Sequence, residues 1–377
     1  DYPKPIKEVK VGDKVLTSSG NYRNVNAVIP SHHSGRILKI KADGLPFIKL
    51  TPNHKIYHIK CKNSLDKKRA IKDKIIDLQP AGLLKKYDYL IYPIPKTSEC
   101  KNIIKTDEYK LLGRNQFGAT FKHKRVNELP PEISLDYNFG LLSGYYLSEG
   151  ISNSDGIAFC FHTKEVDKYS LVEQILQNRF ITKTRVNHNT RNRTILWATG
   201  AQLGRMFGDL FGKGAKNKKL PEWILESPKE FRRGLIESLW KGDGCLWKRK
   251  EYNGLVFELQ TVSKSLAYQT FNLLIAQGFR PTLAFTQRKS MVWRVRINGG
   301  QNFGNFVGIE ENDQKRKRSF RIWSDGNNVY YPISKIGEEN YNGTVYDLNV
   351  DEEHNFCCHS LVKNSGEGFG IPIIEAL

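Results

Sequence analysis

The chain has 377 residues, with 59 Lys and Arg against 39 Asp and Glu, so its formal net charge at pH 7 is +20. Hydrophobic residues make up 39% of the sequence and aromatic residues 11%, which excludes a disordered or fibrous chain and suits two or three packed domains. No apolar run approaches the roughly 18–20 residues that cross a bilayer. With six cysteines and no C-x-x-C pair, these features predict a cytoplasmic protein with no membrane partner. The charge predicts a polyanionic partner.

The first 95 residues show the alternation of apolar and polar side chains that is typical of short β-strands. Val9–Leu16 alternates around a Gly-Asp turn, Ser18–Asn21 is predicted to close a hairpin, and Tyr89–Pro93 is a further strand. The same pattern returns at 329–333 and 345–350, whereas helical periodicity dominates between these stretches. We therefore predict an α+β protein in which an all-β module is split by an inserted domain.

The inserted region contains an internal repeat. One predicted helix ends in Glu149-Gly150, and a second ends in Asp243-Gly244, 94 residues later. Each is followed by a strand, a helix and a basic hairpin whose last strand carries a tryptophan, Trp197 in the first copy and Trp293 in the second. The matching order predicts two pseudo-symmetric halves, residues 134–222 and 223–325.

The two acid-terminated helices are predicted to lie side by side. Ser227-Pro228-Lys229-Glu230 has the pattern of a capping box, so the second helix is expected to begin at Ser227 and to stop near Gly242. Small side chains at Ser143, Gly144 and Ser238 would let the helices approach closely.

Close approach would bring Glu149 and Asp243 together at one end of the helix pair. Adjacent carboxylates need a cation between them, and Mg²⁺ suits oxygen ligands that must also contact a phosphodiester. We therefore predict that Glu149 and Asp243 are metal ligands and that the metal activates water. The alternative for either helix alone is an ordinary C-terminal cap, but two such ends in matching contexts favour a site.

Leu142–Gly150 and Ile236–Gly244 resemble the paired motifs of the LAGLIDADG, or dodecapeptide (DOD-type), homing endonucleases. Glu149, Ser238 and Lys241 stand where that family has Asp, Gly and Asp. The resemblance implies a pseudo-twofold αββαββα domain that cuts double-stranded DNA at a specific site, the host gene without its insertion. A DNA-binding protein of the same descent that no longer cuts is the alternative, motivated by Glu149 and Lys241.

The resemblance also implies a catalytic lysine in the block 216–221, which points to Lys218 or Lys219, with a solvated basic turn as the alternative for each. The basic hairpins are expected to lie along the DNA groove, because a two-stranded ribbon fits the major groove. The predicted DNA-binding residues are Arg191, Arg193, Arg288, Lys289, Arg294 and Arg296.

The terminal β module resembles an intein (Hint) splicing domain. Pro3–Val15 is similar to the stretch that follows an intein's N-terminal nucleophile, and Thr51-Pro52-Asn53-His54 matches the T-x-x-H block. A Thr and a His at this spacing recur by chance, but the position in the chain strengthens the match. The resemblance implies that Thr51 and His54 polarise the upstream scissile amide. It also implies a Cys or Ser nucleophile about a dozen residues upstream of Asp1, so the first strand is expected to be missing from this sequence.

Val345–Phe356 and Ser360–Ser365 resemble the two C-terminal intein blocks. The resemblance implies that the Asn364 side-chain nitrogen attacks its own carbonyl, forming a succinimide and releasing Ser365, the acyl acceptor. His354 is the family's position for an imidazole, and Asp347 is expected to couple the two junctions. Lys363 stands where most inteins have His, which leaves His354 or His359 to substitute.

Residues 365–377 resemble the E-x7-E segment of retaining GT-B glycosyltransferases, with Glu367 and Glu375 eight residues apart. This segment is expected to be the start of the C-terminal host fragment, or extein, in an intein that is joined to its host in cis. The alternatives are a flexible glycine-containing tail and a fragment of a glycosyltransferase gene product.

The predicted architecture is an all-β Hint horseshoe, residues 1–95 and 326–364, split by the endonuclease domain and a linker at 96–133 that is a possible DNA-recognition region. A monomer with internal pseudo-symmetry is expected. Residues 1–130 carry 27 basic and 12 acidic side chains, a net +15, whereas 326–377 carry 2 and 8, a net −6. This distribution suggests that DNA contact extends onto the N-terminal part of the splicing module.

Overall fold

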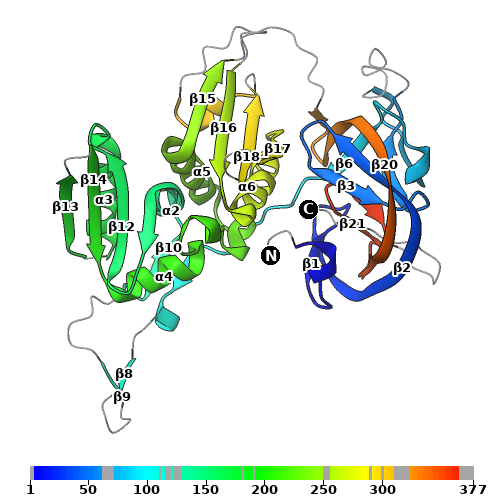
Figure 1. Ribbon diagram of the computed structural model, residues 1–377. Coiled ribbons are helices and arrows are strands. Elements are labelled where there is room, and N and C mark those ends of the chain that lie inside the picture. Colours follow the sequence, from blue (N-terminus) through cyan, green and yellow to red (C-terminus); the bar gives the residue numbers. More distant parts are fainter. Residues whose placement is uncertain are drawn as a thin grey trace. The chain divides into compact units, whose positions relative to one another are not determined.

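The structure is a computed structural model that describes residues 4–61, 72–109, 112–114, 120–122, 129–180, 182–189, 192–248, 255–287, 291–298, 301–309 and 322–364 (Figure 1). The chain divides into two compact units. Unit one comprises Asp1–Lys96, Tyr268–Ile297 and Gln314–Leu377, and unit two comprises Thr97–Ala267 and Asn298–Asp313. The domain boundaries predicted from the sequence remain predictions.

Unit one is built on a ten-stranded antiparallel sheet. Its main path runs through β1 (Lys14–Leu16), β2 (Tyr22–Ala42), β20 (Asn328–Val350), β6 (Tyr89–Pro93), β4 (Lys55–Ile59), β22 (Leu361–Lys363) and β21 (Asn355–Cys357). Three further strands pair at its sides: β3 (Phe47–Leu50) with β2, β5 (Ile76–Pro80) with β4, and β19 (Trp323–Ser324) with β20. The strands predicted near both ends of the sequence therefore share one sheet, and η1 (Ile6–Glu8) and η2 (Ala81–Leu83) are 3₁₀ turns of the same unit.

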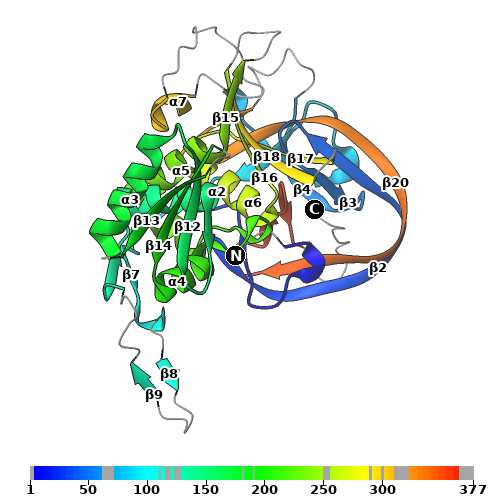
Figure 2. The same ribbon diagram turned by 60° about the vertical axis from the view of Figure 1, so that its left-hand side comes forward.

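The longest elements of unit one are the paired strands β2 and β20, which form a wide arc (Figure 2). The predicted hairpin at 18–21 is confirmed, because Leu16 pairs with Tyr22 across it. The strands predicted at 329–333 and 345–350, by contrast, are the two ends of one 23-residue strand. The middle of β20 lacks apolar alternation because much of it is exposed, and pairing with β2 rather than core burial keeps it extended.

Apolar side chains from distant parts of the sequence fill one core of unit one. Tyr89 and Ile91 of β6 pack with Tyr330 of β20 and Leu361 of β22. Trp323 stacks on Tyr330, with ring centroids 3.9 Å apart. This packing brings the C-terminal strands beside those from the first 95 residues.

Unit two contains the first copy of the repeat, which runs α2 (Tyr137–Glu149), β11 (Gly150–Ser152), β12 (Gly156–His162), α3 (Val166–Phe180), β13 (Thr184–Asn189), β14 (Arg193–Thr199) and α4 (Ala201–Phe211). Its four strands form a sheet in the order β11-β12-β14-β13. The second copy has the same order along the chain: α5 (Lys229–Asp243), β15 (Gly244–Lys248), β16 (Leu255–Thr261), α6 (Lys264–Ala276), β17 (Thr282–Gln287) and β18 (Met291–Asn298). The repeated order of elements inferred from the sequence is confirmed.

Shorter elements complete the described chain. They are β7 (Ile103–Lys105), η3 (Asp107–Tyr109), β8 (Leu112–Arg114), β9 (Thr120–Lys122), β10 (Glu132–Ser134), η4 (Ala215–Asn217), η5 (Glu222–Glu226) and α7 (Phe303–Phe306). Within the described residues, no helix has the length and apolar character needed to span a membrane.

The close approach predicted for the acid-terminated helices is present between α2 and α5. A Cβ atom at Gly144 would overlap the Ser238 hydroxyl and the Leu235 carbonyl oxygen, and one at Gly140 would overlap the Phe231 carbonyl oxygen. The Ser238 hydroxyl donates to the Gly234 carbonyl within its own helix, at 2.9 Å. Two helix backbones can pack this closely only where small residues face each other.

The predicted start of α5 is wrong. The helix begins at Lys229, and the Ser227 hydroxyl donates to the Ile224 carbonyl at 2.7 Å instead of accepting from a helix N–H. The physical reason is that the 3₁₀ turn η5 ends directly before Ser227, and the Ser227 hydroxyl and N–H both bond to the Ile224 carbonyl of that turn. A true cap is present on α2, where Asp136 accepts from the Phe139 N–H at 2.8 Å.

Candidate functional site

The first candidate site lies where α2 and α5 end. Glu149 is the last residue of α2, and Asp243 is the last residue of α5. A Cβ at Gly242 would lie 3.7 Å from Glu149 Oε1, so the Glu149 carboxylate reaches the backbone beside Asp243. The structure therefore brings together the two acids that were separated by 94 residues in the sequence.

Both carboxyl groups are held in an environment that disfavours their charge. Burial, the nearby Asp243 and Glu165 raise the pKa of Glu149 to about 7. Burial likewise raises the pKa of Asp243 to about 6, although Lys218 opposes this effect. A cation bound between the carboxylates would allow both to ionise.

The donor set at the helix ends consists of oxygen atoms. Among the described residues, no group of three or more His, Cys, Asp or Glu side chains converges as a metal cage. Two carboxylates that leave the other positions to water and phosphate suit Mg²⁺ better than a tightly caged ion. Glu149 and Asp243 thus offer the oxygen donors that a hard divalent cation accepts.

Lys218 is the lysine that lies at this site. Only 4% of the residue is exposed, and its Nζ donates to the carbonyl oxygens of Tyr146 (2.6 Å) and Gly150 (2.7 Å) at the end of α2. Burial lowers the Lys218 pKa to about 7, while Asp243 acts to raise it. Lys219 is exposed, and its backbone N–H bonds to the Phe211 carbonyl. The sequence left these two lysines as equal alternatives.

A second lysine, Lys168, lies near the acids and was not predicted from the sequence. Lys168 of α3 pairs with Glu165 at 2.6 Å and donates to the Lys241 carbonyl oxygen, also at 2.6 Å, near the end of α5. The charge of Lys168 opposes the increase in the Glu149 pKa. Only an i,i+3 pair at the start of a helix marks Lys168, and such pairs are common on surfaces.

Lys241, which stands where the resembling family has an acid, is neutralised inside its own helix. Its Nζ lies 2.6 Å from Glu237 Oε1, and the other Glu237 oxygen accepts from the Tyr137 hydroxyl at 2.6 Å. Glu237 is 7% exposed, and the Lys241 side chain is partly exposed, so the ion pair is partly shielded from water. Lys241 therefore adds no unpaired charge to the acidic site.

The predicted DNA-binding residues are only partly described. Arg193 is exposed at the start of β14. Arg294 and Arg296 are two residues apart in β18, hence on one face of the strand, and are half-buried. Arg191, Arg288 and Lys289 lie outside the described residues.

The second candidate site lies in unit one, around the predicted splice residues. Thr51 and His54 are buried in the turn before β4, where the His54 N–H bonds to the Thr51 carbonyl at 3.1 Å. Asn364 follows β22 and is 2% exposed. Because Val362 of β22 pairs with Ile56 of β4, the structure brings these two sequence blocks together.

Asn364 is hydrogen-bonded mainly to the backbone. Its N–H donates to the His354 carbonyl oxygen at 3.0 Å. With its side-chain amide oriented by its neighbours, Nδ2 donates to the same oxygen at 2.7 Å and Oδ1 accepts from the Val350 N–H at 3.1 Å. His354 itself is exposed and has a left-handed φ of 51°.

Asp347 and His359 lie in different environments. Asp347 is buried in β20, and its carboxylate helps burial to raise the pKa of the Cys358 thiol. His359 is buried and hydrogen-bonded to the Tyr268 hydroxyl (2.9 Å) and the Phe47 carbonyl oxygen (3.3 Å). Ser365 and residues 366–377 lie outside the described residues.

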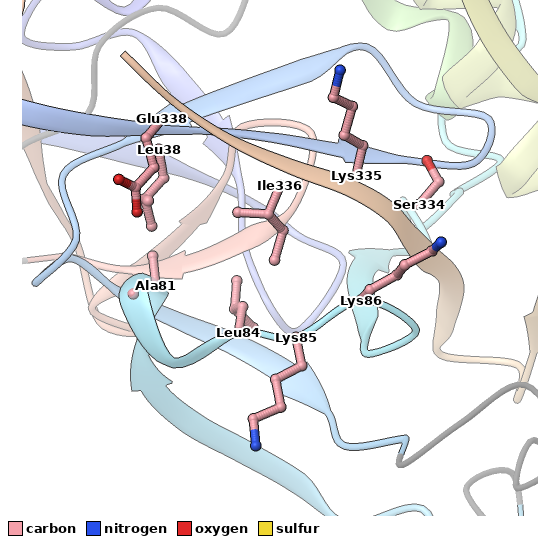
Figure 3. A pocket seen from close by; sticks show the side chains of 10 residues that line it. Leu38, Ala81, Leu84, Lys85, Lys86, Ser334, Lys335, Ile336 and Glu338 are labelled. Carbon is pink, nitrogen blue, oxygen red and sulfur yellow. The ribbon is translucent and has the colours of Figure 1, made fainter. Parts of the chain in front are cut away.

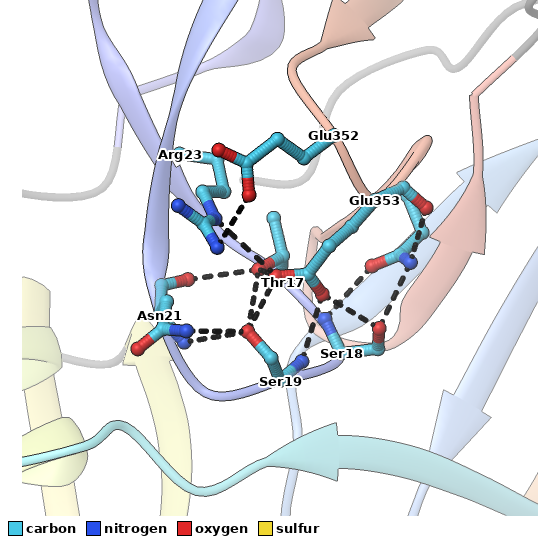
Figure 4. Close-up of polar contacts among 8 residues, drawn as sticks. Thr17, Ser18, Ser19, Asn21, Arg23, Glu352 and Glu353 are labelled. Carbon is cyan, nitrogen blue, oxygen red and sulfur yellow. Dashed lines mark hydrogen bonds and ion pairs between the residues drawn. The ribbon is translucent and has the colours of Figure 1, made fainter.

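A polar cluster around Glu353 connects the start of the chain to the segment before β21 (Figure 4). The Glu353 carboxylate accepts from the hydroxyls of Thr17 and Ser18, each at 2.8 Å, and from the Ser19 N–H at 2.9 Å. Burial alone would raise the pKa of Glu353, but the hydrogen bonds from Ser19, Ser18 and Thr17 lower it to about 2. Sequence reasoning missed this cluster because its members are more than 330 residues apart.

An open cavity of about 560 Å³ also lies in unit one (Figure 3). Apolar side chains, including Leu38, Leu84 and Ile336, form part of its lining, and Lys85, Lys86 and Lys335 extend outward around it. Lys85 and Lys86 come from the basic first part of the chain, whereas Lys335 comes from the acidic C-terminal part.

Comparison with known proteins finds relatives over nearly the whole chain. The ATP-dependent DNA helicase Hel308 of Thermococcus kodakarensis is 26% identical over 407 residues, which cover 99% of this chain and 36% of the helicase. An uncharacterized protein of Methanocaldococcus jannaschii is 29% identical over 387 residues, 94% of this chain and 47% of that protein. The chain thus spans less than half the length of each.

A DNA polymerase of Thermococcus litoralis is 26% identical over 361 residues, covering 83% of this chain and 20% of the polymerase. Among solved structures, I-DmoI in complex with DNA and Ca aligns with a TM-score of 0.35 and 13% identity, covering 46% of this chain and 88% of I-DmoI. The N-terminal LAGLIDADG domain of DUF199/WhiA aligns with a TM-score of 0.34 and 11% identity, covering 47% of this chain and 83% of that domain.

The family profile described as the intein splicing domain matches residues 5–364, which is nearly the whole chain. The matched region includes the turn of Thr51 and His54 near one end and Asn364 at the other. This chain belongs to the intein splicing domain family.

Proposed function

We propose that this protein is a splicing intein whose C-terminal cleavage is carried out by Asn364. The observation that supports this proposal is the burial of Asn364 at the end of β22, beside the strand that follows Thr51 and His54. Asn364 Nδ2 forms a bond to the Asn364 carbonyl carbon, and the peptide bond to Ser365 breaks. One proton leaves Nδ2 and one reaches the departing α-amino group, so a succinimide and a free amine result.

The roles proposed for the other splice residues follow the family. Thr51 and His54 polarise the upstream scissile amide, and Asp347 couples the two junctions. His354 contributes at the C-terminal junction, where its carbonyl oxygen holds Asn364. Ser365 is the acyl acceptor, and residues 365–377 are the first part of a glycosyltransferase-like host fragment.

The proposed splicing step has a direct test. The 377-residue chain is expressed and incubated, and its mass is followed over time. Loss of the mass of residues 365–377 is expected in the parent chain and not in Asn364→Ala. An intact mass that persists equally in both would reject the proposal.

We further propose that the inserted region is a DNA endonuclease that acts at the paired ends of α2 and α5. The supporting observation is the pair of adjacent carboxyl groups with raised pKa values beside a buried lysine. Mg²⁺ held by Glu149 and Asp243 would neutralise the phosphodiester and activate water. Because Lys218 has a pKa near 7, its amine can hold positive charge near the phosphate or take a proton from water.

The proposed DNA partner is the host-gene site that lacks the intein, bound by one monomer. Arg193, Arg294 and Arg296 are proposed to contact the DNA, as are Arg191, Arg288 and Lys289. The Hint module (1–95 and 326–364), the linker (96–133) and the endonuclease (134–325) are the proposed domains. The second candidate function is DNA binding without cleavage, which the Lys241–Glu237 pair favours, because an acid of the resembling family is replaced there by a neutralised lysine.

A DNA assay separates the two candidates. The protein and Mg²⁺ are incubated with a panel of duplexes, each joining the coding sequences that flank the insertion. A double-strand cut that Asp243→Asn abolishes without loss of DNA binding is expected. Specific binding with no cut in either protein across the panel would favour the second candidate instead.

A further inference from the structure

Asn364 follows β22, a strand with a neighbour on each side, and a histidine directly precedes each neighbour: His54 before β4 and His354 before β21. The local strand order is β4-β22-β21, so β22 has two neighbours at this end. On the β21 side, the Asn364 N–H bonds to the His354 carbonyl, which continues the pairing of Lys363 with Asn355 by one residue. His354 is therefore the residue opposite Asn364 on that strand.

On the other side, extending the antiparallel pairing of β22 with β4 beyond its one pair points to His54 as the residue opposite Asn364. Val362 pairs with Ile56, and advancing two residues along β22 while stepping back two along β4 reaches Asn364 and His54. On the β5 side, the His54 carbonyl accepts from the Ala81 N–H at 2.8 Å, one residue beyond the pairing of Lys55 with Pro80, while the His54 N–H closes the turn to the Thr51 carbonyl.

The pattern of burial agrees with this register. Ile56 and Val362 are fully buried, and His54 and Asn364 are 3% and 2% exposed. Lys55 and Lys363, which lie between them, are both exposed. Residues opposite each other in an antiparallel pair project to the same face, with Cα atoms about 4.5–5.5 Å apart. The buried face of this pair thus carries the side chains of His54 and Asn364.

The two other basic positions at the junction do not share that face. Lys363, which stands where the family usually has His, is exposed. His354 is exposed too, and its left-handed φ of 51° turns it out of the regular strand path. His354 meets Asn364 through its carbonyl oxygen, which bonds to the Asn364 N–H and side-chain Nδ2.

We propose that the imidazole of His54 serves the cyclisation of Asn364, in addition to any role at the upstream junction. In this step the imidazole accepts the proton that leaves Asn364 Nδ2 as the new C–N bond forms. The resulting imidazolium donates a proton to the departing α-amino group as the peptide bond to Ser365 breaks, so the imidazole is regenerated and no co-reactant is needed. The inference rests on the proposed splicing function.

The test measures release of residues 365–377 from the full chain by mass spectrometry, because this step requires no upstream nucleophile. His54→Ala is expected to slow release by about 10²-fold or more, as removal of a general acid–base group does. Added imidazole is expected to restore part of the rate in His54→Ala but not in Asn364→Ala. Loss of structure alone would not be repaired by imidazole.

His58→Gln provides the matched control. His58 is a buried histidine of the same strand, but it pairs with Leu90 of β6 rather than with β22. The release rate of His58→Gln is expected to stay within threefold of the parent rate. Its thermal stability is expected to be similar to that of His54→Ala. If His54→Ala releases the segment at the parent rate and His354→Ala does not, the inference about His54 is overturned. The proposed splicing function would still stand in that case. A parent chain that never releases the segment overturns both the inference and the proposed splicing function.

Discussion

The ammonium group of Lys218 lies 3.5 Å from the centroid of the Tyr146 ring and 2.6 Å from the Tyr146 carbonyl oxygen. A cation over an aromatic face and against the carbonyl end of a helix is stabilised by both. These contacts hold Lys218 at the end of α2 even though burial lowers its pKa to about 7. The same helix end carries Glu149, so the position of Lys218 is tied to that of the acidic pair.

Replacing Lys218 by Met would remove the charge that the proposed endonuclease mechanism places beside the acidic pair. Single-turnover cleavage of a substrate duplex is expected to slow by about 10²–10³-fold, as when one preorganised group is removed from a transition state. Lys216→Met is the matched control, because Lys216 is exposed in the same loop. Equal rates in the two variants would contradict the role proposed for Lys218.

We expect the acidic pair to make stability depend on pH and, through the proposed metal site, on Mg²⁺. The pKa of Glu149 rises from its ordinary value of 4.5 to about 7 in the folded protein, mainly through burial. Between these values the folded state binds more protons than the unfolded state, so stability falls as the pH rises through this window. Mg²⁺ should offset the loss, because it binds the ionised form.

Thermal melts at pH 5 and pH 7.5, with and without MgCl₂, measure this linkage. The increase in Tm caused by MgCl₂ is expected to be larger at pH 7.5, and Glu149→Gln should reduce that difference. An increase of the same size at both pH values would show that the acidic pair does not bind the metal.

The α2–α5 interface predicts a severe effect of one added methyl group. Ala has a helix propensity about 1 kcal/mol better than Gly, so propensity alone would make Gly144→Ala stabilising. The new Cβ would overlap the Leu235 carbonyl oxygen, a backbone atom that cannot move without displacing α5. Overpacking of this kind costs about 1–3 kcal/mol, and we expect net destabilisation.

Chemical denaturation of Gly144→Ala measures this change. Asn138→Ala, at an exposed position near the start of α2, is expected to stay within about 0.5 kcal/mol of the parent. An unchanged midpoint for Gly144→Ala would argue against the close approach of the helices.

The Glu353 cluster predicts sensitivity to acid. Because hydrogen bonds lower the Glu353 pKa to about 2 in the folded protein, its contribution is complete above its ordinary pKa of about 4.5 and is lost as the pH falls toward 2. Its side chain is 16% exposed, so the bonds are largely shielded from water. Glu353→Gln is expected to lower the free energy of unfolding at pH 7 by about 1–3 kcal/mol.

The control for this variant is Glu352→Gln. The Glu352 side chain is 59% exposed and pairs with Arg23, and exposed ion pairs contribute about 1 kcal/mol or less. Denaturation at pH 7 and pH 3 should show a difference between Glu353→Gln and the parent that shrinks at the lower pH. A constant difference would mean that the ionised carboxylate is not what stabilises the cluster.

The sequence by itself determined the features that depend on local pattern. The two acid-terminated helices and the repeated order of elements follow from periodicity and spacing, and the residues of the splice blocks follow from the resemblance of short motifs to a known family. These patterns persist in the structure because each helix buries its own face and each strand alternates its own side chains. Even so, the start of α5 was misplaced, since Ser227 could serve either the turn before it or the helix after it.

Only the tertiary structure decided which of several similar residues reaches a site. It distinguished buried Lys218 from exposed Lys219, added Lys168 beside Glu149, and showed that His354 meets Asn364 through its backbone. It also joined two predicted strands into β20 and tied Glu353 to residues at the other end of the sequence. In each case the outcome depends on burial and pairing between segments distant in the chain, which no local pattern records.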